Sequence, residues 1–152
     1  MRRIVTENGP DGKSRIMRID ELPAHSDIWE SDSDNPLGFL PRPDSLGSLD
    51  FLSGGVKVMS LNLPTDADMV EYLKDGIPGH DEHGFHRTPT LDILILLEGE
   101  LSLELDDGLT SMKPGDVVVQ RNTNHAWRNT GDKPARCFSV ICSPVNGLNT
   151  ER

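Results

Sequence analysis

Two histidines and one carboxylate stand out among the residue types that could do chemistry in this chain. His86 and Asp92 lie at the start of one apolar segment, and His125 follows a second. Residues 86, 88 and 92 share one parity and residues 125, 127 and 129 share another, so each segment could direct its polar groups into one interior if no bulge intervenes. The spacing therefore predicts a shared pocket, with three further pocket residues: Thr88, Trp127 and Asn129.

Imidazole nitrogens and carboxylate oxygens are ligands for divalent transition metals. A set made of His86, Asp92 and His125 suits Fe(II), Zn(II), Mn(II) or Ni(II), with open positions for water and substrate. Thr88 lies in the same segment, but a threonine hydroxyl is a poor metal ligand. The alternative is a hydrogen-bonded polar cluster of these four residues without an ion, in which the carboxylate fixes an imidazole tautomer.

The two segments resemble the two motifs of the cupin superfamily. The first cupin motif reads His-x-His, three or four residues, Glu, six residues and Gly. The second contains Gly-Asp, a Pro-x-Gly turn, His, three residues and Asn. On this pattern His86 takes the first histidine position, Asp92 the glutamate position, His125 the last histidine position and Asn129 the closing asparagine position.

The chain departs from the cupin pattern at several positions. Thr88 stands where the second histidine belongs, and Arg121 and Thr123 replace the proline and glycine of the second turn. Asp92 is also about one methylene shorter than the glutamate usual at its position. The resemblance therefore implies a divalent metal site of reduced affinity, and the cluster without a metal stays open as the alternative.

The resemblance runs from about Val56 to Ser143 and implies an all-β fold, the double-stranded β-helix or cupin jelly roll. It also implies a protein with a small-molecule ligand. The leading hypothesis is a metal-dependent lyase or isomerase, such as a decarboxylase or dehydratase, or a dioxygenase if the ion is Fe(II). His86 or His125 would then be catalytic and handle a proton. The alternative is a non-catalytic binding or sensing cupin without a bound metal.

Short strands must position these residues. Residues 56–63 alternate between apolar and polar, and a meander of strands with hairpin turns follows from residue 91 to residue 142. Between them, Thr65 is a candidate N-cap, acids follow it, and Gly76 closes the segment, which together predict one short helix. This helix would be inserted just before the site, at the mouth of the pocket, as a lid or as a subunit contact.

The chain is predicted to be one domain over residues 1–152. We divide it into N-terminal strands with an acidic loop (1–55), a jelly-roll core (56–143) and a tail (144–152). Residues 1–19 suggest a hairpin or two edge strands, and residues 20–50 mostly a loop with one short strand near Trp29. Three aromatic residues in the acidic segment suggest apolar surface that needs cover, and small cupins commonly pair, so we expect a homodimer; these residues are Trp29, Phe39 and Phe51.

Composition excludes several classes of protein. The net charge is −10 and the Lys and Arg residues do not cluster, which argues against binding to nucleic acid or an anionic membrane. The sequence shows no leader and no apolar run that could span a membrane, so we expect a cytoplasmic protein. Cys137 and Cys142 are an odd number of residues apart in a predicted strand, so they should point to opposite faces and stay reduced.

A second group of candidate ligands precedes the site. His80 and His83 lie in a segment that begins at Gly79 and ends at Gly84. Either imidazole could replace the missing ligand, because this segment leads directly into His86. The glycines and the lack of strand alternation favour an exposed polar loop instead.

Overall fold

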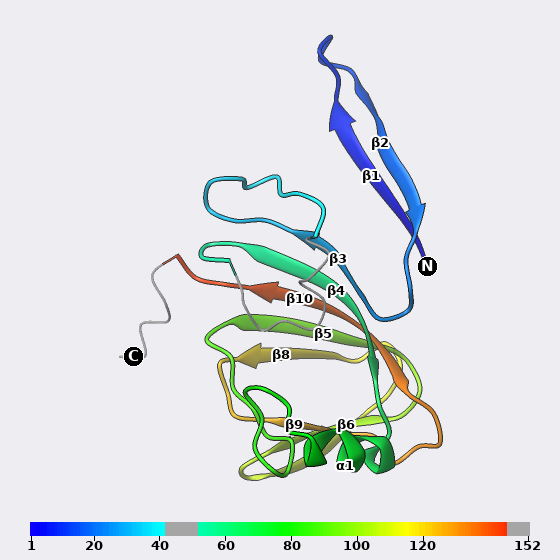
Figure 1. Ribbon diagram of the computed structural model, residues 1–152, viewed down its shortest axis with the longest axis vertical. Helices are drawn as coiled ribbons and strands as arrows, with labels where there is room; N and C mark the ends of the chain where they lie inside the picture. Colours follow the sequence, from blue (N-terminus) through cyan, green and yellow to red (C-terminus); the bar gives the residue numbers. More distant parts are fainter. Residues whose placement is uncertain (42–51, 146–152) are drawn as a thin grey trace.

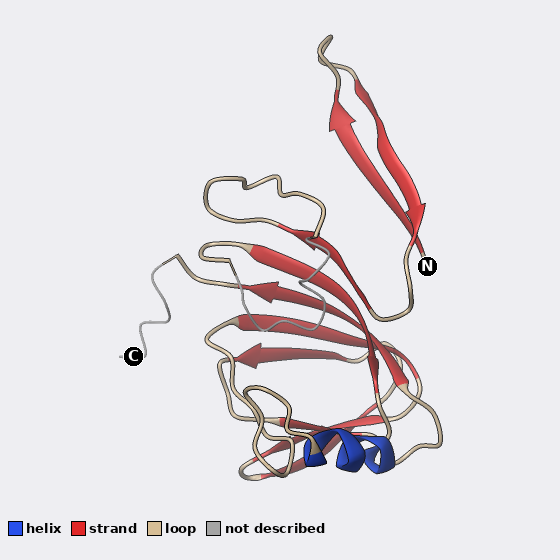
Figure 2. Cartoon of the chain, viewed as in Figure 1, coloured by secondary structure: helices blue, strands red, loops and turns tan. Residues whose placement is uncertain are grey.

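The computed structural model describes residues 1–41 and 52–145, and within them most elements are strands (Figures 1 and 2). A two-stranded sheet contains β1 (Arg2–Asn8) and β2 (Ser14–Glu21). A five-stranded antiparallel sheet has the order β3 (Ser26–Glu30), β4 (Val56–Leu63), β10 (Ala135–Cys142), β5 (Leu91–Glu98) and β8 (Val117–Arg121). A three-stranded sheet has the order β7 (Gly108–Met112), β6 (Leu101–Leu105) and β9 (Ala126–Arg128). The predicted all-β fold, a double-stranded β-helix with one short helix, is confirmed.

Alternation along the strands separates an inner face from an outer face of the five-stranded sheet. In β10 the odd-numbered residues from Ala135 to Ile141 are buried, and the side chains between them are exposed or half-buried. The buried core is built mainly from leucines of β5 and β6 and from β10, and includes Leu94, Leu96, Leu101 and Cys137. This core holds the two sheets together and leaves space between them toward β9.

The two cysteines behave as their spacing predicts. Both are free thiols; Cys137 is fully buried on the inner face, and Cys142 lies on the other side of β10. Burial raises the pKa of the Cys137 thiol to about 12. This thiol is therefore protonated at neutral pH and acts as a small apolar side chain in the core.

The predicted helix is present as α1 (Asp66–Lys74). Thr65 caps it, because its hydroxyl accepts a hydrogen bond from the backbone N–H of Asp68 at 3.2 Å and donates one to the Asp68 carboxylate at 2.9 Å. The helix is tied to the three-stranded sheet, since the carboxylate of Asp66 accepts a hydrogen bond from the backbone N–H of Asn129 at 2.8 Å.

Removing the cap should loosen this helix. Thr65→Ala leaves a backbone N–H at the start of α1 without its partner, so we expect the free energy of unfolding to fall by about 1 kcal/mol. Urea unfolding followed by circular dichroism measures this change. Thr110→Ala, at an exposed position of β7, is the matched control and should change the free energy by no more than about 0.5 kcal/mol. An equal loss in both variants would contradict the capping role.

The N-terminal segment contributes more to the sheet than the sequence suggested. The jelly-roll core was expected to begin at residue 56, but β3 pairs with β4 and forms one edge of the five-stranded sheet. Trp29 and Phe39 are half-buried by their own loop: the Trp29 indole donates to the Leu37 carbonyl at 3.0 Å, and Phe39 bridges back to Glu30. Phe51 lies outside the described residues.

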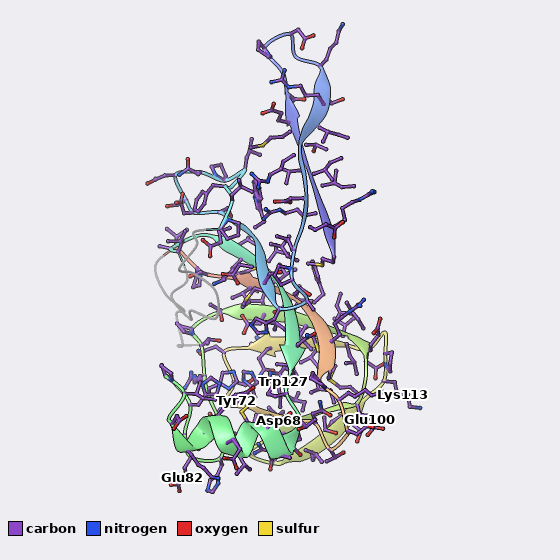
Figure 3. The ribbon with its side chains drawn as sticks, turned by 45° about the vertical axis from the view of Figure 1, so that its right-hand side comes forward. Asp68, Tyr72, Glu82, Glu100, Lys113 and Trp127 are labelled. Atoms are coloured by element: carbon purple, nitrogen blue, oxygen red, sulfur yellow. The ribbon has the colours of Figure 1, made fainter. Side chains whose placement is uncertain are left out.

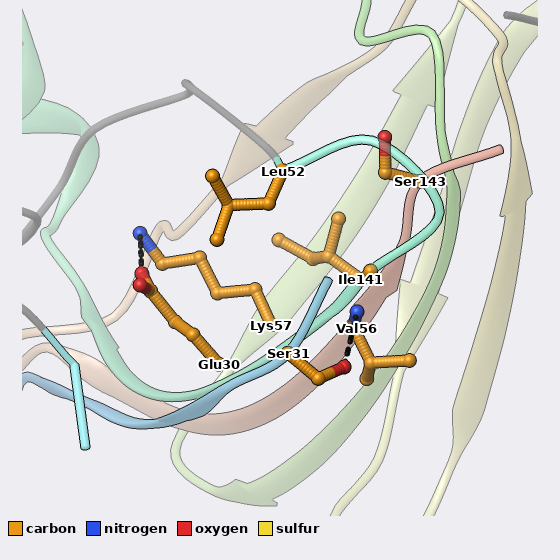
Figure 4. A pocket seen from close by; sticks show the side chains of 8 residues that line it. Glu30, Ser31, Leu52, Val56, Lys57, Ile141 and Ser143 are labelled. Atoms are coloured by element: carbon orange, nitrogen blue, oxygen red, sulfur yellow. Dashed lines mark hydrogen bonds and ion pairs between the residues drawn. The ribbon is translucent and has the colours of Figure 1, made fainter. Parts of the chain in front are cut away.

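A buried ion cluster fixes β3 to β4 beside a small recess of about 10 Å³ (Figure 4). The ammonium of Lys57 lies 2.9 Å from a carboxylate oxygen of Asp27 and 3.5 Å from one of Glu30. All three side chains are buried. The recess has room for no more than a water molecule, so it is a structural feature and not a ligand site.

Within the described ranges, no helix is long and apolar enough to cross a membrane.

Candidate functional site

A cavity of about 240 Å³ lies on the inner face of the five-stranded sheet. Its apolar wall includes Met59, Leu61, Leu63, Leu94, Trp127 and Ile141. Its polar residues are His25, His80, His86, Thr88, Asp92, Gln120, His125 and Ser139. The cavity therefore offers an apolar enclosure with a few polar groups gathered in it, which is the usual composition of a small-molecule site.

His86 and His125 lie side by side because their backbones pair. Each backbone N–H donates to the carbonyl of the other residue, at 2.9 and 3.0 Å, in an antiparallel bridge. Directly opposed residues carry neighbouring side chains, and the two ring centroids are 4.2 Å apart with the planes tilted by 50°. The edge of Trp127 packs against His125 with the ring centroids 5.5 Å apart.

Both imidazoles are held neutral, with one ring nitrogen directed at a backbone carbonyl. The Nδ1 atom of His125 lies 3.0 Å from the Thr123 carbonyl, and that of His86 lies 3.4 Å from the Gly84 carbonyl. A carbonyl only accepts, so Nδ1 carries the proton and Nε2 keeps a free lone pair. Burial lowers the pKa of both rings, that of His86 to about 4. At neutral pH the site therefore presents two unprotonated Nε2 atoms.

Asp92 shares the cavity and has one oxygen without a partner. The Thr90 hydroxyl donates to the Thr88 hydroxyl at 2.8 Å, and Thr88 donates to Oδ2 of Asp92 at 3.2 Å. The other oxygen, Oδ1, is buried with no hydrogen-bond partner among the described residues. Burial raises the pKa of Asp92, although the threonine hydrogen bonds and nearby His125 oppose this effect. The carboxyl group thus holds a proton more readily than an exposed aspartate does.

His80 joins the site, which corrects the interpretation of its segment as an exposed polar loop. Its ring stacks on that of His86, with centroids 4.0 Å apart and planes 30° apart. The segment closes into a turn because the Asp81 carboxylate accepts hydrogen bonds from the backbone of His83 and Phe85, at 2.9 and 2.8 Å. His83 itself is exposed, with 72% of its side chain accessible.

Asn129 is placed differently from the expected pocket role. Its side chain is 1% exposed and lies outside the cavity lining. The amide donates to the carbonyls of Lys133 and Leu63, at 2.9 and 3.3 Å, and accepts from the backbone of Gly131 at 3.0 Å. Asn129 therefore organises the turn after β9. Trp127, by contrast, lines the cavity and lies on the sheet side of α1, whereas Glu82 lies on the far side (Figure 3).

Several cavity residues were not identified from the sequence. Gln120 is 4% exposed on the inner face of β8, and Ser139 is 3% exposed on the inner face of β10. The sequence could have identified both as cavity residues, since each is a polar residue at an inward position of an apolar strand. His25 lies before β3, and nothing in its local sequence points to the cavity.

The donor types for a divalent ion are present, but their arrangement does not fit one. Within residues 1–41 and 52–145, no three His, Cys, Asp or Glu side chains converge as a metal-holding group. Lone pairs of an imidazole lie in the ring plane, and the stacked rings of His80 and His86 have planes only 30° apart. The set of His86, Asp92 and His125 predicted from the sequence lies around one cavity, and its role as a set of metal ligands stays a prediction.

Restoring the missing histidine should create metal affinity. The Thr88 side chain is buried at the cavity, so Thr88→His adds an imidazole to those of His86 and His125 at the family position. We expect zinc to bind at least about tenfold more tightly than to the wild type, or ~1.4 kcal/mol. Isothermal titration calorimetry with Zn(II) measures the affinity. Thr110→His, at an exposed position of β7, is the control. Equal affinity in wild type and Thr88→His would contradict the assignment of position 88.

Comparison with known proteins agrees with the sequence motifs. Residues 76–141 match the family model of the cupin domain. Oryzines biosynthesis cluster protein J of Aspergillus oryzae is 56% identical over 46 residues, which cover 30% of this chain and 26% of that protein. The cupin-domain-containing oxidoreductase fogC of Aspergillus ruber is 39% identical over 90 residues, which cover 54% of this chain and 44% of that protein. The chain spans less than half the length of these curated relatives.

Solved structures with a related arrangement of strands include a cupin protein from Bacteroides fragilis. It has a TM-score of 0.46 and 16% identity, covering 82% of this chain and 81% of that one. An RmlC-like cupin with a double-stranded β-helix fold from Methanocaldococcus jannaschii has a TM-score of 0.42 and 22% identity. The match covers 59% of this chain and 70% of that one.

Proposed function

Because this chain belongs to the cupin superfamily, we propose that it is a small-molecule enzyme whose cavity histidines transfer protons during a lyase or isomerase reaction. One observation carries the proposal: two neutral imidazoles and a carboxyl group of raised pKa lie around one largely apolar cavity. Perturbed titratable groups in an enclosed site are typical of proton-transfer chemistry.

The cavity wall indicates the class of substrate. Leucine, methionine and tryptophan side chains form most of the enclosure, and the polar groups gather around His86, Asp92 and His125. Such a site favours a small aromatic or aliphatic molecule that carries one carbonyl or carboxylate group. The apolar part would pack against the wall, and the polar group would take the hydrogen bonds that the buried side chains leave open.

The protonation states suggest which residue accepts a proton and which donates one. His86 or His125, with a free Nε2 lone pair, would accept a proton from the carbon next to the substrate carbonyl. Asp92, whose pKa burial raises, would donate a hydrogen bond to the carbonyl oxygen when it carries a proton. Return of the proton to a different atom completes an isomerisation.

A second candidate function is an oxidoreductase. The names of several curated relatives favour it, among them the cupin-domain-containing oxidoreductases virC of Hypocrea virens and fogC of Aspergillus ruber. Cupins commonly bind metal, and an Fe(II)-dependent dioxygenase is one form that this function could take if the cavity side chains, which do not converge as a metal-holding group among the described residues, turn to hold the ion. Oxygen consumption by the protein supplied with Fe(II) and a candidate substrate would support this second function.

Deuterium exchange tests the proposed function without knowledge of the natural reaction. A panel of small aromatic and aliphatic carbonyl compounds is incubated with the protein in D₂O and followed by proton NMR. Proton transfer at carbon replaces hydrogen by deuterium next to the carbonyl, even when no net reaction occurs. We expect exchange above the buffer rate for at least one compound that also raises the melting temperature.

The same panel separates catalysis from binding. Compounds that raise the melting temperature but exchange no faster than in buffer would overturn the catalytic proposal and favour the non-catalytic binding or sensing cupin.

A further inference from the structure

His25 lines the cavity from the end opposite to the histidines of the two motifs. It precedes β3, at one edge of the five-stranded sheet, whereas Asp92 and Gln120 lie on β5 and β8 at the other edge. In Figure 1 the chain enters β3 on the right of the sheet and passes from β8 to β9, where His125 lies, on the left. The cavity therefore has a His25 end and a His125 end.

The strand register separates the same two ends along the strands. Asp92 pairs with Ile141, and Ile141 pairs with Lys57 of β4. The His25 ring contacts Asn62, five residues further along β4. Five residues of an antiparallel strand span about 17 Å. Side chains reach into the cavity from both ends and shorten this separation, but the two polar ends do not meet.

The middle of the cavity is mostly apolar. Ser139 lies there, and its neighbours across both adjacent strands are Met59 and Leu94. An apolar cavity of about 150 Å³ holds one benzene ring, so the 240 Å³ of this cavity has room for a ring with a substituent at each end. The shape therefore suits an elongated molecule with an apolar middle.

The two ends offer opposite hydrogen-bonding groups. The Nδ1 atom of His25 accepts a hydrogen bond from the backbone N–H of Asn62 at 3.4 Å. A backbone N–H only donates, so the neutral His25 ring carries its proton on Nε2 and presents a donor. His86 and His125 carry the proton on Nδ1 and present Nε2 as an acceptor. The ligand group at the His25 end must therefore accept a hydrogen bond.

From these observations we propose that His25 is a specificity residue, which holds a second, uncharged carbonyl group of the substrate by a hydrogen bond from Nε2. No Lys or Arg of the described residues lines the cavity, so a carboxylate at this end would lack a countercharge. The substrate class is then a one-ring compound with a carbonyl group at each end. Only the placement of the reacting carbonyl at the His125 end rests on the proposed function.

Two compounds of the same shape test the contact with His25. Para-diacetylbenzene has a carbonyl at each end, and para-isopropylacetophenone replaces one acetyl group by an isopropyl group. His25→Phe keeps a ring but loses the donor, and His25→Gln keeps an N–H donor of similar reach. His83→Phe, at an exposed position, is the control. Isothermal titration calorimetry at pH 7.5 gives both dissociation constants for each protein, and circular dichroism checks the folding.

We expect the wild type to bind para-diacetylbenzene at least about fivefold more tightly than para-isopropylacetophenone, which corresponds to one neutral hydrogen bond. This preference should persist in His83→Phe and His25→Gln and fall to within about twofold in His25→Phe. Because the ratio is compared between proteins, the symmetry of the diacetyl compound does not affect the result.

Several results would overturn the proposal. They are a wild type that binds neither compound or shows no preference, a preference that survives in His25→Phe, and a loss in His25→Gln as well, which would mean that His25 only supports the backbone at Asn62. Tighter binding of para-acetylbenzoate than of para-diacetylbenzene would overturn the uncharged class. A preference that depends on His25, without deuterium exchange of either compound, would support this inference while the proposed catalysis fails.

Discussion

Replacing His125 with glutamine should slow deuterium exchange of a responsive carbonyl compound by about 100- to 10,000-fold, the range for loss of a general base. Glutamine keeps a polar side chain of similar reach but offers no basic nitrogen. The backbone bridge to His86 does not depend on the side chain, so the site should keep its shape. The measurement is the initial exchange rate in D₂O at saturating compound.

His83→Gln is the matched control. His83 belongs to neither cupin motif, and its ring is exposed outside the cavity lining, so this substitution removes an imidazole without touching the cavity. It should leave the exchange rate within about twofold of wild type. Equal rates in His125→Gln and wild type would show that His125 is not the base.

Lowering the pH should destabilise the wild type more than a variant without the His86 imidazole. The pKa of His86 is about 4 in the folded protein, below its ordinary value of 6.5, because burial disfavours the charged ring. Between these values the unfolded chain binds a proton that the folded chain does not, so the free energy of unfolding falls as pH drops from about 6.5 to about 4. Above pH 6.5 this contribution is constant.

The expected loss from His86 is on the order of 2–3 kcal/mol. Urea unfolding of wild type and His86→Gln at pH 7.5 and pH 4.5 measures it, and His83→Gln is again the control. The difference in stability between the two pH values should be smaller in His86→Gln than in wild type and unchanged in the control. An identical pH dependence in wild type and His86→Gln would contradict a buried neutral ring.

Local patterns predicted most of the fold. Alternation in residues 56–63 and the turns of the later meander gave β4, β5, β6, β8 and β10, and the Thr65 cap with Gly76 gave α1. These features depend on neighbours along the chain. The position of β3 at the sheet edge depends on distant pairing with β4, so local signals indicated a short strand but not its place.

The site was predictable in its residues but not in its geometry. The parity of the residue numbers along each strand predicted that four residues face one cavity. The structure places all four in its lining: His86, Thr88, Asp92 and His125. The stacking of His80 depends on a turn closed by Asp81 and cannot be inferred from glycine spacing. Whether three ligands converge is decided by ring orientations, which a motif does not encode.

The protonation of the two cavity imidazoles tests the central claim most directly. Nitrogen-15 NMR of the protein labelled at histidine reports, for each ring, which nitrogen carries the proton at each pH. We expect His86 and His125 at pH 7 to be neutral, with the proton on Nδ1 and a free Nε2, and His86 to titrate near pH 4. Doubly protonated rings at pH 7, or a proton on Nε2 in both, would contradict the account of these residues as the bases of the site.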